Sequence, residues 1–188
     1  MNQPYASNSP DEILMQGCIE GNRLAQKYLY QRYYGQYVVI PMRYLNNRED
    51  ALGVLNQAFL KIFNSLEQFK GDGPLAAWMG KIVLHTTLDH VRSQKTYRQK
   101  IHFPTEPEEQ PIRDEAMDNL LAEELLALIQ KLPDTTRAVF SLYVIDGFKH
   151  REIAEQLSIE ENTSKWYLSQ ARRQLQDMLQ QQQTSQAL

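Results

Sequence analysis

The chain has 188 residues, of which 42% are hydrophobic, a formal net charge of −3 at pH 7 and a single cysteine, Cys18. This composition excludes a disordered chain, and one cysteine excludes an internal disulfide. No segment resembles a secretory signal or approaches the roughly 18 apolar residues of a membrane span. We therefore expect a soluble intracellular protein, located in the cytoplasm, with one medium or two small domains.

The N-terminal half has the residue spacing of helices. Apolar residues recur every three to four positions in four stretches, which begin near residues 11, 22, 48 and 75. Asp11 and Glu12 stand in the first turn of the first stretch, where the helix dipole favours acidic groups. We expect Pro41 to kink or interrupt the second helix. The glycine-rich segment 71–74 predicts the turn before the fourth.

The charges are segregated along the chain. Residues 78–100 contain five basic residues against Asp89 alone, whereas residues 101–124 contain eight acidic residues against Arg113 alone. Three prolines interrupt the acidic block, and proline fixes φ and removes a hydrogen-bond donor. We therefore predict an acidic linker at 98–116 that divides one domain at 11–97 from another at 117–180. Residues 1–10 and 181–188 are expected to be flexible tails.

The C-terminal domain has the pattern of a helix-turn-helix. A helix starts at Leu132-Pro133, and Gly147 is suited to end it because glycine accepts a positive φ. A short helix around residues 151–157 and a tight turn at Ser158 precede a long basic helix. Such a unit places one helix in the major groove of DNA. The alternative is that these amphipathic helices form an ordinary bundle.

The apolar positions of this domain predict its core. Two sets are expected inside, one before the turn and one on the inner side of the last helix: Val139, Phe140, Tyr143 and Val144, then Leu168, Ala171, Leu175 and Met178. Ser164 and Trp166 are expected on outer faces of that helix. Because no part of the chain alternates with a period of two, we predict an all-α fold of two small helical domains.

A second motif combines aromatic and basic residues. Phe69 and Trp78 flank the glycine-rich turn, and Lys81 and Arg92 follow on the next helix. Aromatic rings that stack on bases, next to cations that contact phosphates, are suited to single-stranded DNA. The alternative is that both aromatic side chains belong to the core.

Three segments together resemble extracytoplasmic-function sigma factors, the two-domain branch of the bacterial sigma superfamily. ILMQGCIEGNRLAQKYLYQRYY resembles the opening helices of that family. EDALGVLNQAFLKIFNSLEQFKGDGPLAAWMGKIVLHTTLDHVRSQK resembles its core-binding and −10-recognition segment, and LPDTTRAVFSLYVIDGFKHREIAEQLSIEENTSKWYLSQARRQL its −35-recognition helix-turn-helix. The resemblance covers nearly all of residues 11–180, in order. It implies a protein that binds core RNA polymerase and directs transcription from promoters by recognising −35 and −10 elements.

The resemblance also implies roles for individual residues. The polymerase-binding face would contain Asp50, Leu55, Asn56, Gln57, Phe59 and Lys61. The −10 element would be contacted by Lys70, Gly71, Asp72, Gly73, Pro74, Leu75, Trp78, Lys81, His85, Thr86, Asp89, His90 and Arg92. The −35 element would be contacted by Arg151, Thr163, Ser164, Lys165, Trp166, Ser169, Gln170, Arg172 and Arg173. Core RNA polymerase and promoter DNA are the implied partners, an anti-sigma factor is a further candidate, and the free protein would be a monomer.

Some positions depart from the family pattern. Leu52-Gly53 and Asn56-Gln57 replace carboxylates that would face the polymerase, and a glycine inside a helix costs about 1 kcal/mol relative to alanine. The alternative function is therefore a sigma-like DNA-binding regulator or decoy with weakened core binding. Ser158 replaces a glycine in the turn, and Trp166 replaces a small polar residue. No catalytic residue, metal site or cofactor is expected, because the four histidines lack ligand spacing with Cys18 or a carboxylate cluster.

Overall fold

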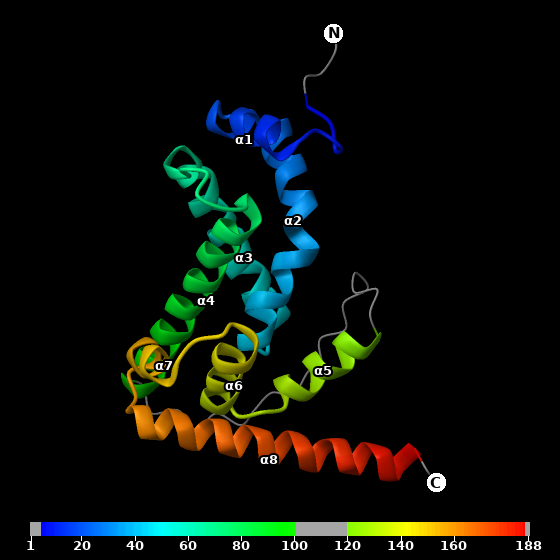
Figure 1. Ribbon diagram of the computed structural model, residues 1–188, viewed down its shortest axis with the longest axis vertical. Coiled ribbons are helices and arrows are strands. Elements are labelled where there is room, and N and C mark those ends of the chain that lie inside the picture. The colour runs from blue at the N-terminus through cyan, green and yellow to red at the C-terminus, as the bar shows by residue number, and fades with distance from the viewer. Residues whose placement is uncertain (1–4, 101–119, 187–188) are drawn as a thin grey trace. The chain divides into compact units, whose positions relative to one another are not determined.

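The protein was analysed as a computed structural model, which describes residues 5–100 and 120–186 (Figure 1). All regular secondary structure in these two ranges is helical, so the predicted all-α fold is confirmed. The predicted acidic linker lies almost wholly outside the described residues. Among the residues that are described, no helix combines the length and the apolar character that crossing a membrane requires.

The chain divides into two compact units. The first comprises Met1–Pro41 and Glu49–His90, and the second comprises Met42–Arg48 and Val91–Leu188. This division follows contacts in space, so the last residues of two N-terminal helices, 42–44 and 91–100, belong to the second unit. The predicted domains 11–97 and 117–180 are continuous segments of the sequence, whereas the two units are not. The functions assigned to these domains remain predictions.

The N-terminal helices begin where the sequence predicts. They are α1 (Asp11–Ile19), α2 (Arg23–Tyr44), α3 (Arg48–Ser65), the short 3-10 helix η1 (Leu66–Gln68) and α4 (Leu75–Lys100) (Figure 1). α2 continues through Pro41 without a break. α4 extends beyond the predicted end at 95, so residues 98–100 are helical rather than linker.

Aromatic rings fill the core of the first unit. Phe59 is buried on α3, and its ring centroid lies 4.5 Å from that of Tyr30 and 6.2 Å from that of Tyr37. The Tyr37 hydroxyl donates to the carbonyl oxygen of Ala76 at 2.7 Å, which fastens the start of α4 to α2. Burial raises the pKa of the Cys18 thiol to about 11, so this cysteine is unreactive at neutral pH.

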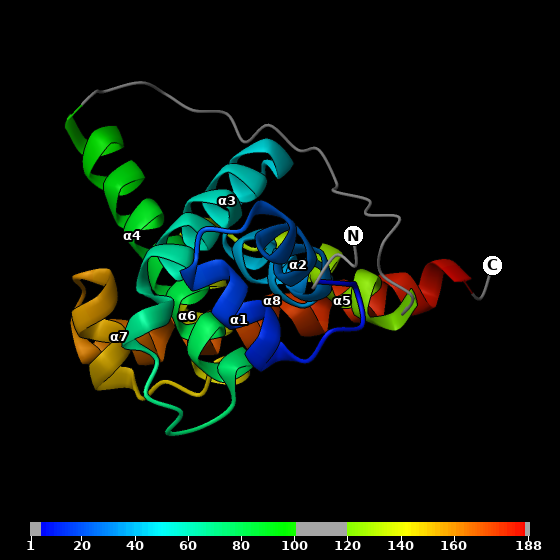
Figure 2. The ribbon, with the colours of Figure 1, turned by 90° about the horizontal axis from the view of Figure 1, so that it is seen from above.

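The second unit contains the predicted helix-turn-helix. Its helices are α5 (Leu120–Gln130), α6 (Asp134–Phe140), the π-helical turn η2 (Ser141–Ile145), α7 (His150–Leu157) and α8 (Glu161–Gln186). The long α8 runs under α5, α6 and α7 (Figures 1 and 2). A core cluster of this unit consists of Leu128, Leu132, Ala171 and Leu175, and Phe140 and Met178 pack against it.

Within the described part of the second unit, two residues adopt a positive φ, and both lie at the end of a helical segment. Gly147 has φ 76°, and Ser158 has φ 51° and ψ 53° at the end of α7. The sequence predicts both, and the left-handed serine carries the strain that glycine would avoid. The predicted stripe before Gly147 is wrong in part: Val139 is buried, but Tyr143 and Val144 are exposed, because η2 widens the helix at this point.

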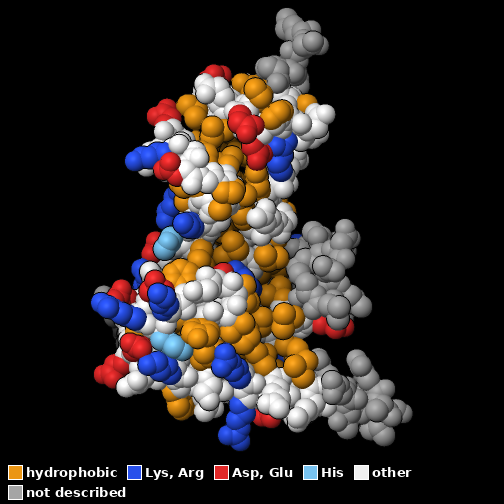
Figure 3. Space-filling model, viewed as in Figure 1, with side chains coloured by type: hydrophobic (Ala, Val, Ile, Leu, Met, Phe, Trp, Pro, Cys, Tyr) orange, Lys and Arg blue, Asp and Glu red, His pale blue; other side chains and the backbone are white. Residues whose placement is uncertain are grey.

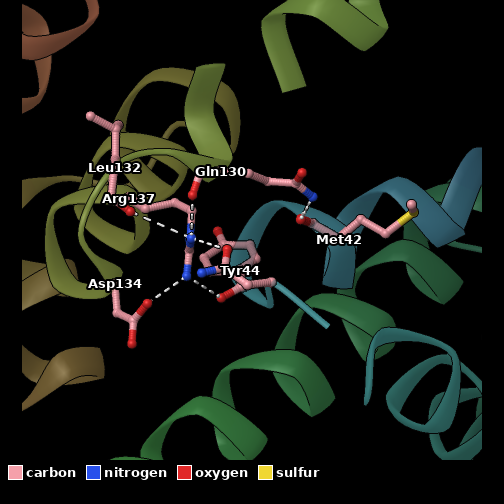
Figure 4. A network of polar contacts seen from close by, with 7 residues as sticks. Met42, Tyr44, Gln130, Leu132, Asp134 and Arg137 are labelled. Atoms are coloured by element: carbon pink, nitrogen blue, oxygen red, sulfur yellow. Dashed lines mark hydrogen bonds and ion pairs between the residues drawn. The ribbon is translucent and has the colours of Figure 1, made fainter. Parts of the chain in front are cut away.

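A buried arginine organises the second unit (Figure 4). Arg137 is 1% exposed, and its guanidinium donates to the carbonyl oxygens of Gln130 at 2.9 Å and Tyr44 at 3.2 Å and to the Asp134 carboxylate at 2.7 Å. Burial lowers its pKa from the ordinary value, and Asp134 opposes this change. Since Tyr44 ends α2, this network ties residues 42–48 to the start of α6.

Candidate nucleic-acid interface

The outer face of α8 carries a cluster of cationic and aromatic side chains. Lys165, Trp166, Ser169, Arg172 and Arg173 are all exposed, and their spacing of three or four residues places them along one side of the helix. In the space-filling view, basic side chains gather with acidic ones where Figure 1 places α7 and the beginning of α8 (Figure 3). This face is suited to phosphate contacts and to base-edge contacts in a groove.

Trp166 is a surface residue. Its side chain is 57% exposed, and its ring meets that of Tyr167 edge-on with centroids 5.0 Å apart. The sequence left open whether this tryptophan is buried, and the structure places it outside the core. An exposed indole can contact bases or the apolar methyl group of thymine.

Ser164 is the residue of α8 that the sequence placed incorrectly. It is completely buried, so the prediction of an outer-face position and direct DNA contact is wrong. Its hydroxyl lies 2.9 Å from Nδ1 of His150, the first residue of α7. Thr163 and Gln170, also predicted to contact DNA, are half-buried. Their positions in the helical repeat explain this: Ser164 lies on the packed side of α8, and Thr163 and Gln170 lie at its margins.

Two of the basic side chains predicted to contact the −35 element form ion pairs with acidic neighbours on their own helices. Nζ of Lys165 lies 2.7 Å from the carboxylate of Glu161, one turn earlier in α8. This hydrogen bond lowers the pKa of Glu161 below its ordinary value. Nε of Arg151, which the sequence assigned to phosphate contact, lies 3.5 Å from the carboxylate of Glu155. Sequence analysis missed Glu161, although its spacing of four residues from Lys165 is the signal for such a pair.

The glycine-rich loop of the first unit, which the sequence predicts to contact the −10 element, is exposed. Lys70, Gly71, Asp72, Gly73 and Pro74 are all exposed, and Gly71 has φ 76°. Leu75, predicted as part of this site, is buried at the start of α4.

The aromatic pair beside this loop is partly accessible. The ring centroids of Phe69 and Trp78 lie 5.5 Å apart, and both side chains are half-buried. The two rings therefore pack on one another, as core residues would. They also keep accessible surface, which stacking on DNA bases requires.

One side of α4, the helix that follows this loop in the chain, is exposed. Lys81, His85 and Asp89 follow one another at four-residue spacing and are exposed. Thr86, which was predicted to contact DNA, is buried on the opposite side, and His90 is half-buried. Arg92 donates from Nε to the carbonyl oxygen of Gln156 at 2.7 Å within the second unit.

The predicted polymerase-facing helix presents a narrower face than the sequence indicated. Asp50, Asn56, Gln57 and Lys61 are exposed on α3. Leu55 and Phe59 are buried in the core, so their assignment to the docking face is wrong.

An exposed leucine enlarges this face. Leu60 is 63% exposed, and helical spacing places it near Asn56 and Gln57. A β-carbon added to Gly53 would meet nothing within 4 Å. The face therefore combines two charged side chains, two amides and one leucine, and Leu60 is the residue of this face that the sequence analysis missed.

No group of three metal-ligating side chains occurs within the part of the chain that the structure describes. The exposed surfaces that the sequence predicts to bind macromolecules lie on α8, around residues 70–89 and on α3.

Comparisons with known proteins match both units. The family model for Sigma-70 region 2 matches residues 29–97, and that for Sigma-70 region 4 matches residues 122–175. The ECF RNA polymerase sigma-E factor of Haemophilus influenzae is 22% identical over 186 residues, which cover 93% of this chain and 98% of that protein. The ECF RNA polymerase sigma factor SigM of Mycobacterium tuberculosis H37Rv is 27% identical over 171 residues, 90% of this chain and 84% of the relative.

A solved structure shares the fold. The sigma factor RpoE in complex with the anti-sigma factor NepR, from Bartonella quintana, aligns with a TM-score of 0.50 and 17% sequence identity. The alignment covers 82% of this chain and 96% of that one.

Proposed function

The chain belongs to the sigma-70 family, in its extracytoplasmic-function branch, and we propose on this premise that it is a promoter-specificity subunit of RNA polymerase. It binds core polymerase and directs transcription initiation from particular promoters. The observation that carries this conclusion is that both family regions match in order, and each coincides with an exposed surface of suitable chemistry. The alternative of a decoy is not favoured, because the relatives are named as RNA polymerase sigma factors.

We assign −35 recognition to the outer face of α8. Lys165, Arg172 and Arg173 would contact phosphates, and Trp166 with Ser169 would face base edges. Phosphate contacts set position and most of the affinity, whereas groove contacts set the sequence preference. Ser164, being buried, is removed from the contact set.

We assign −10 recognition to the loop at 70–74 and the exposed side of α4. Trp78, half-buried against Phe69, would stack on a base that leaves the duplex, which contributes about 1–3 kcal/mol per base. Lys70 and Lys81 are exposed cations beside it and would contact the backbone of the opened strand. Leu75 and Thr86 support this surface from inside.

We assign core binding to α3. Asp50, Asn56, Gln57 and Lys61 remain in the proposed contact set, and Leu60 joins it in place of the buried Leu55 and Phe59. The set combines two charged side chains, Asp50 and Lys61, with two amides and one leucine. Its charge contacts should weaken as salt increases, whereas the burial of Leu60 should not depend on screening.

In the proposed function, this protein recognises the promoter, and the polymerase carries out RNA synthesis. Such a subunit acts where RNA polymerase acts, so we place it in the cytoplasm. An anti-sigma factor that covers the α3 or α8 surface is a further candidate partner.

Reconstitution with core polymerase tests the function. Core enzyme plus the full chain should give run-off transcripts from a restricted set of genomic fragments, and sequencing of their 5′ ends should reveal shared −35 and −10 motifs. Leu60→Ala should weaken co-purification with core, while Leu179→Ala, an exposed leucine near the end of α8, serves as the matched control. Intact duplex binding without core binding or transcription would instead support the decoy.

A further inference from the structure

A polar joint connects the two helices of the helix-turn-helix. Ser164 is completely buried in the first turns of α8, where its hydroxyl requires a partner. The hydroxyl lies 2.9 Å from Nδ1 of His150. Because His150 is the first residue of α7, this hydrogen bond joins the beginnings of both helices. Leaving such a hydroxyl unpaired is unfavourable, so the bond favours one orientation of α8 against α7.

The imidazole of His150 is held on its other side by an aromatic ring. Tyr143 of η2 stacks on it with centroids 4.5 Å apart and an interplanar angle of 23°. The ring of His150, which belongs to α7, is thus contacted by η2 through Tyr143 and by α8 through Ser164. This arrangement positions one nitrogen toward Ser164 and leaves the imidazole half-buried.

The charges that surround His150 come mainly from α8. Desolvation lowers its pKa below the ordinary value, Lys165 and Arg172 lower it further, and Glu161 opposes them. From η2, the ring of Tyr143 faces the imidazole. His150 is therefore neutral in the free protein at neutral pH.

The cations that act on His150 are the ones assigned to DNA phosphates. When phosphates bind to Lys165 and Arg172, they bring negative charge next to the imidazole and compensate the repulsion. We propose that His150 is a positioning residue for α8 that acts through Ser164, and that duplex binding by α8 draws a proton onto its imidazole. This inference rests on the proposed DNA-binding role of α8.

The direction of the effect follows from linkage. Binding raises the pKa of His150 above that of the free protein, so the complex holds more protons than the free components. Affinity for DNA then increases as pH falls through the bound-state pKa, and levels off below the free-state pKa. The hydrogen bond survives protonation, because a protonated Nδ1 donates to the serine oxygen where a neutral one accepts from the hydroxyl.

The test uses the full chain and a fluorescent duplex of about 30 base pairs of random sequence at low salt, where phosphate contacts dominate. Anisotropy is measured from about pH 7.5 to about pH 5.5, on both sides of the ordinary histidine pKa. Two variants separate the roles. His150→Asn places an amide where Nδ1 lies and cannot titrate, whereas His150→Ala leaves Ser164 without its partner.

The wild type should gain affinity as pH falls, by about tenfold for each unit by which binding raises the pKa. His150→Asn should bind as the wild type does at the upper pH and lose this histidine's part of the gain. His150→Ala should bind about fivefold more weakly than the wild type at the upper pH. Because alanine cannot titrate, this deficit should grow as pH falls and the wild type gains affinity. Proton NMR of the imidazole, with and without duplex, should show the rise in pKa directly, and circular dichroism should show that each variant is folded.

Two results would overturn the inference: His150→Asn with the full pH response of the wild type, or His150→Ala with wild-type affinity. A third variant separates this failure from that of the proposed function. If Lys165→Ala leaves duplex binding unchanged, α8 is not the DNA-binding surface and the functional assignment itself fails. If Lys165→Ala weakens binding while the histidine variants behave as wild type, only the role of His150 is lost.

Discussion

Substitutions at the two ends of one ion pair should change DNA binding in opposite directions. Lys165 and Glu161 are 2.7 Å apart, and their side chains are 52% and 49% exposed. A pair this exposed is weakly stabilising, so a phosphate can take the lysine from its carboxylate. Lys165→Ala should remove one phosphate contact. Glu161→Gln should free the lysine and remove a negative charge that repels DNA.

The magnitudes follow from counterion release. Loss of one phosphate contact lowers the slope of log affinity against log salt by about 0.9, whatever the DNA sequence. Glu161→Gln should raise affinity about two- to threefold at low salt, and the gain should fade as salt screens the exposed charge. In the Lys165→Ala background the gain should be smaller, because only the direct repulsion between Glu161 and DNA remains.

Anisotropy titrations of the four proteins at several salt concentrations form a double-mutant cycle. The wild type serves as the reference for the three variants. The reasoning is refuted if Glu161→Gln weakens binding, or if Lys165→Ala leaves the salt slope unchanged.

Three further predictions concern stability and surface position. Arg137→Met should lower the free energy of unfolding by about 3 kcal/mol in urea titrations, because the buried carbonyls of Gln130 and Leu132 lose their donor; a loss below about 1 kcal/mol would contradict the network. Gly53→Ala should raise it by about 1 kcal/mol, since the added methyl meets no neighbour, and no gain would argue against a helical α3 at this point. Trp166→Ala should change stability by less than about 0.5 kcal/mol yet alter the preferred −35 sequence in run-off selections, whereas an unfolded product would place the indole in the core.

The helices themselves were predictable because their signals are local. Asp11 in a first turn, the glycine-rich turn at 71–74 and Gly147 each mark a boundary through backbone preferences that act within a few residues. The starts of α1 to α4 therefore agree with the structure. The prediction of the buried stripe failed at Tyr143 because a π-helical turn shifts the side-chain phase, and no local signal announces that turn.

The candidate sites were predictable by segment and less so by residue. The family pattern located three surfaces, but a linear motif does not tell which side of its helix faces the core. Leu55, Phe59, Thr86 and Ser164 lie in those segments and are buried. Burial is decided by the neighbouring helices, and those contacts are long-range in sequence.

By itself, the sequence determined the helical fold, the starts of the N-terminal helices, the family resemblance and the basic character of α8, because periodicity, capping and composition depend on neighbouring residues. Only the tertiary structure decided that Trp166 is exposed, that Ser164 is bonded to His150, that Leu60 lies on the surface and that Arg137 holds the end of α2. Each of these depends on which atoms meet across distant parts of the chain, where packing and the pairing of buried polar groups select one arrangement.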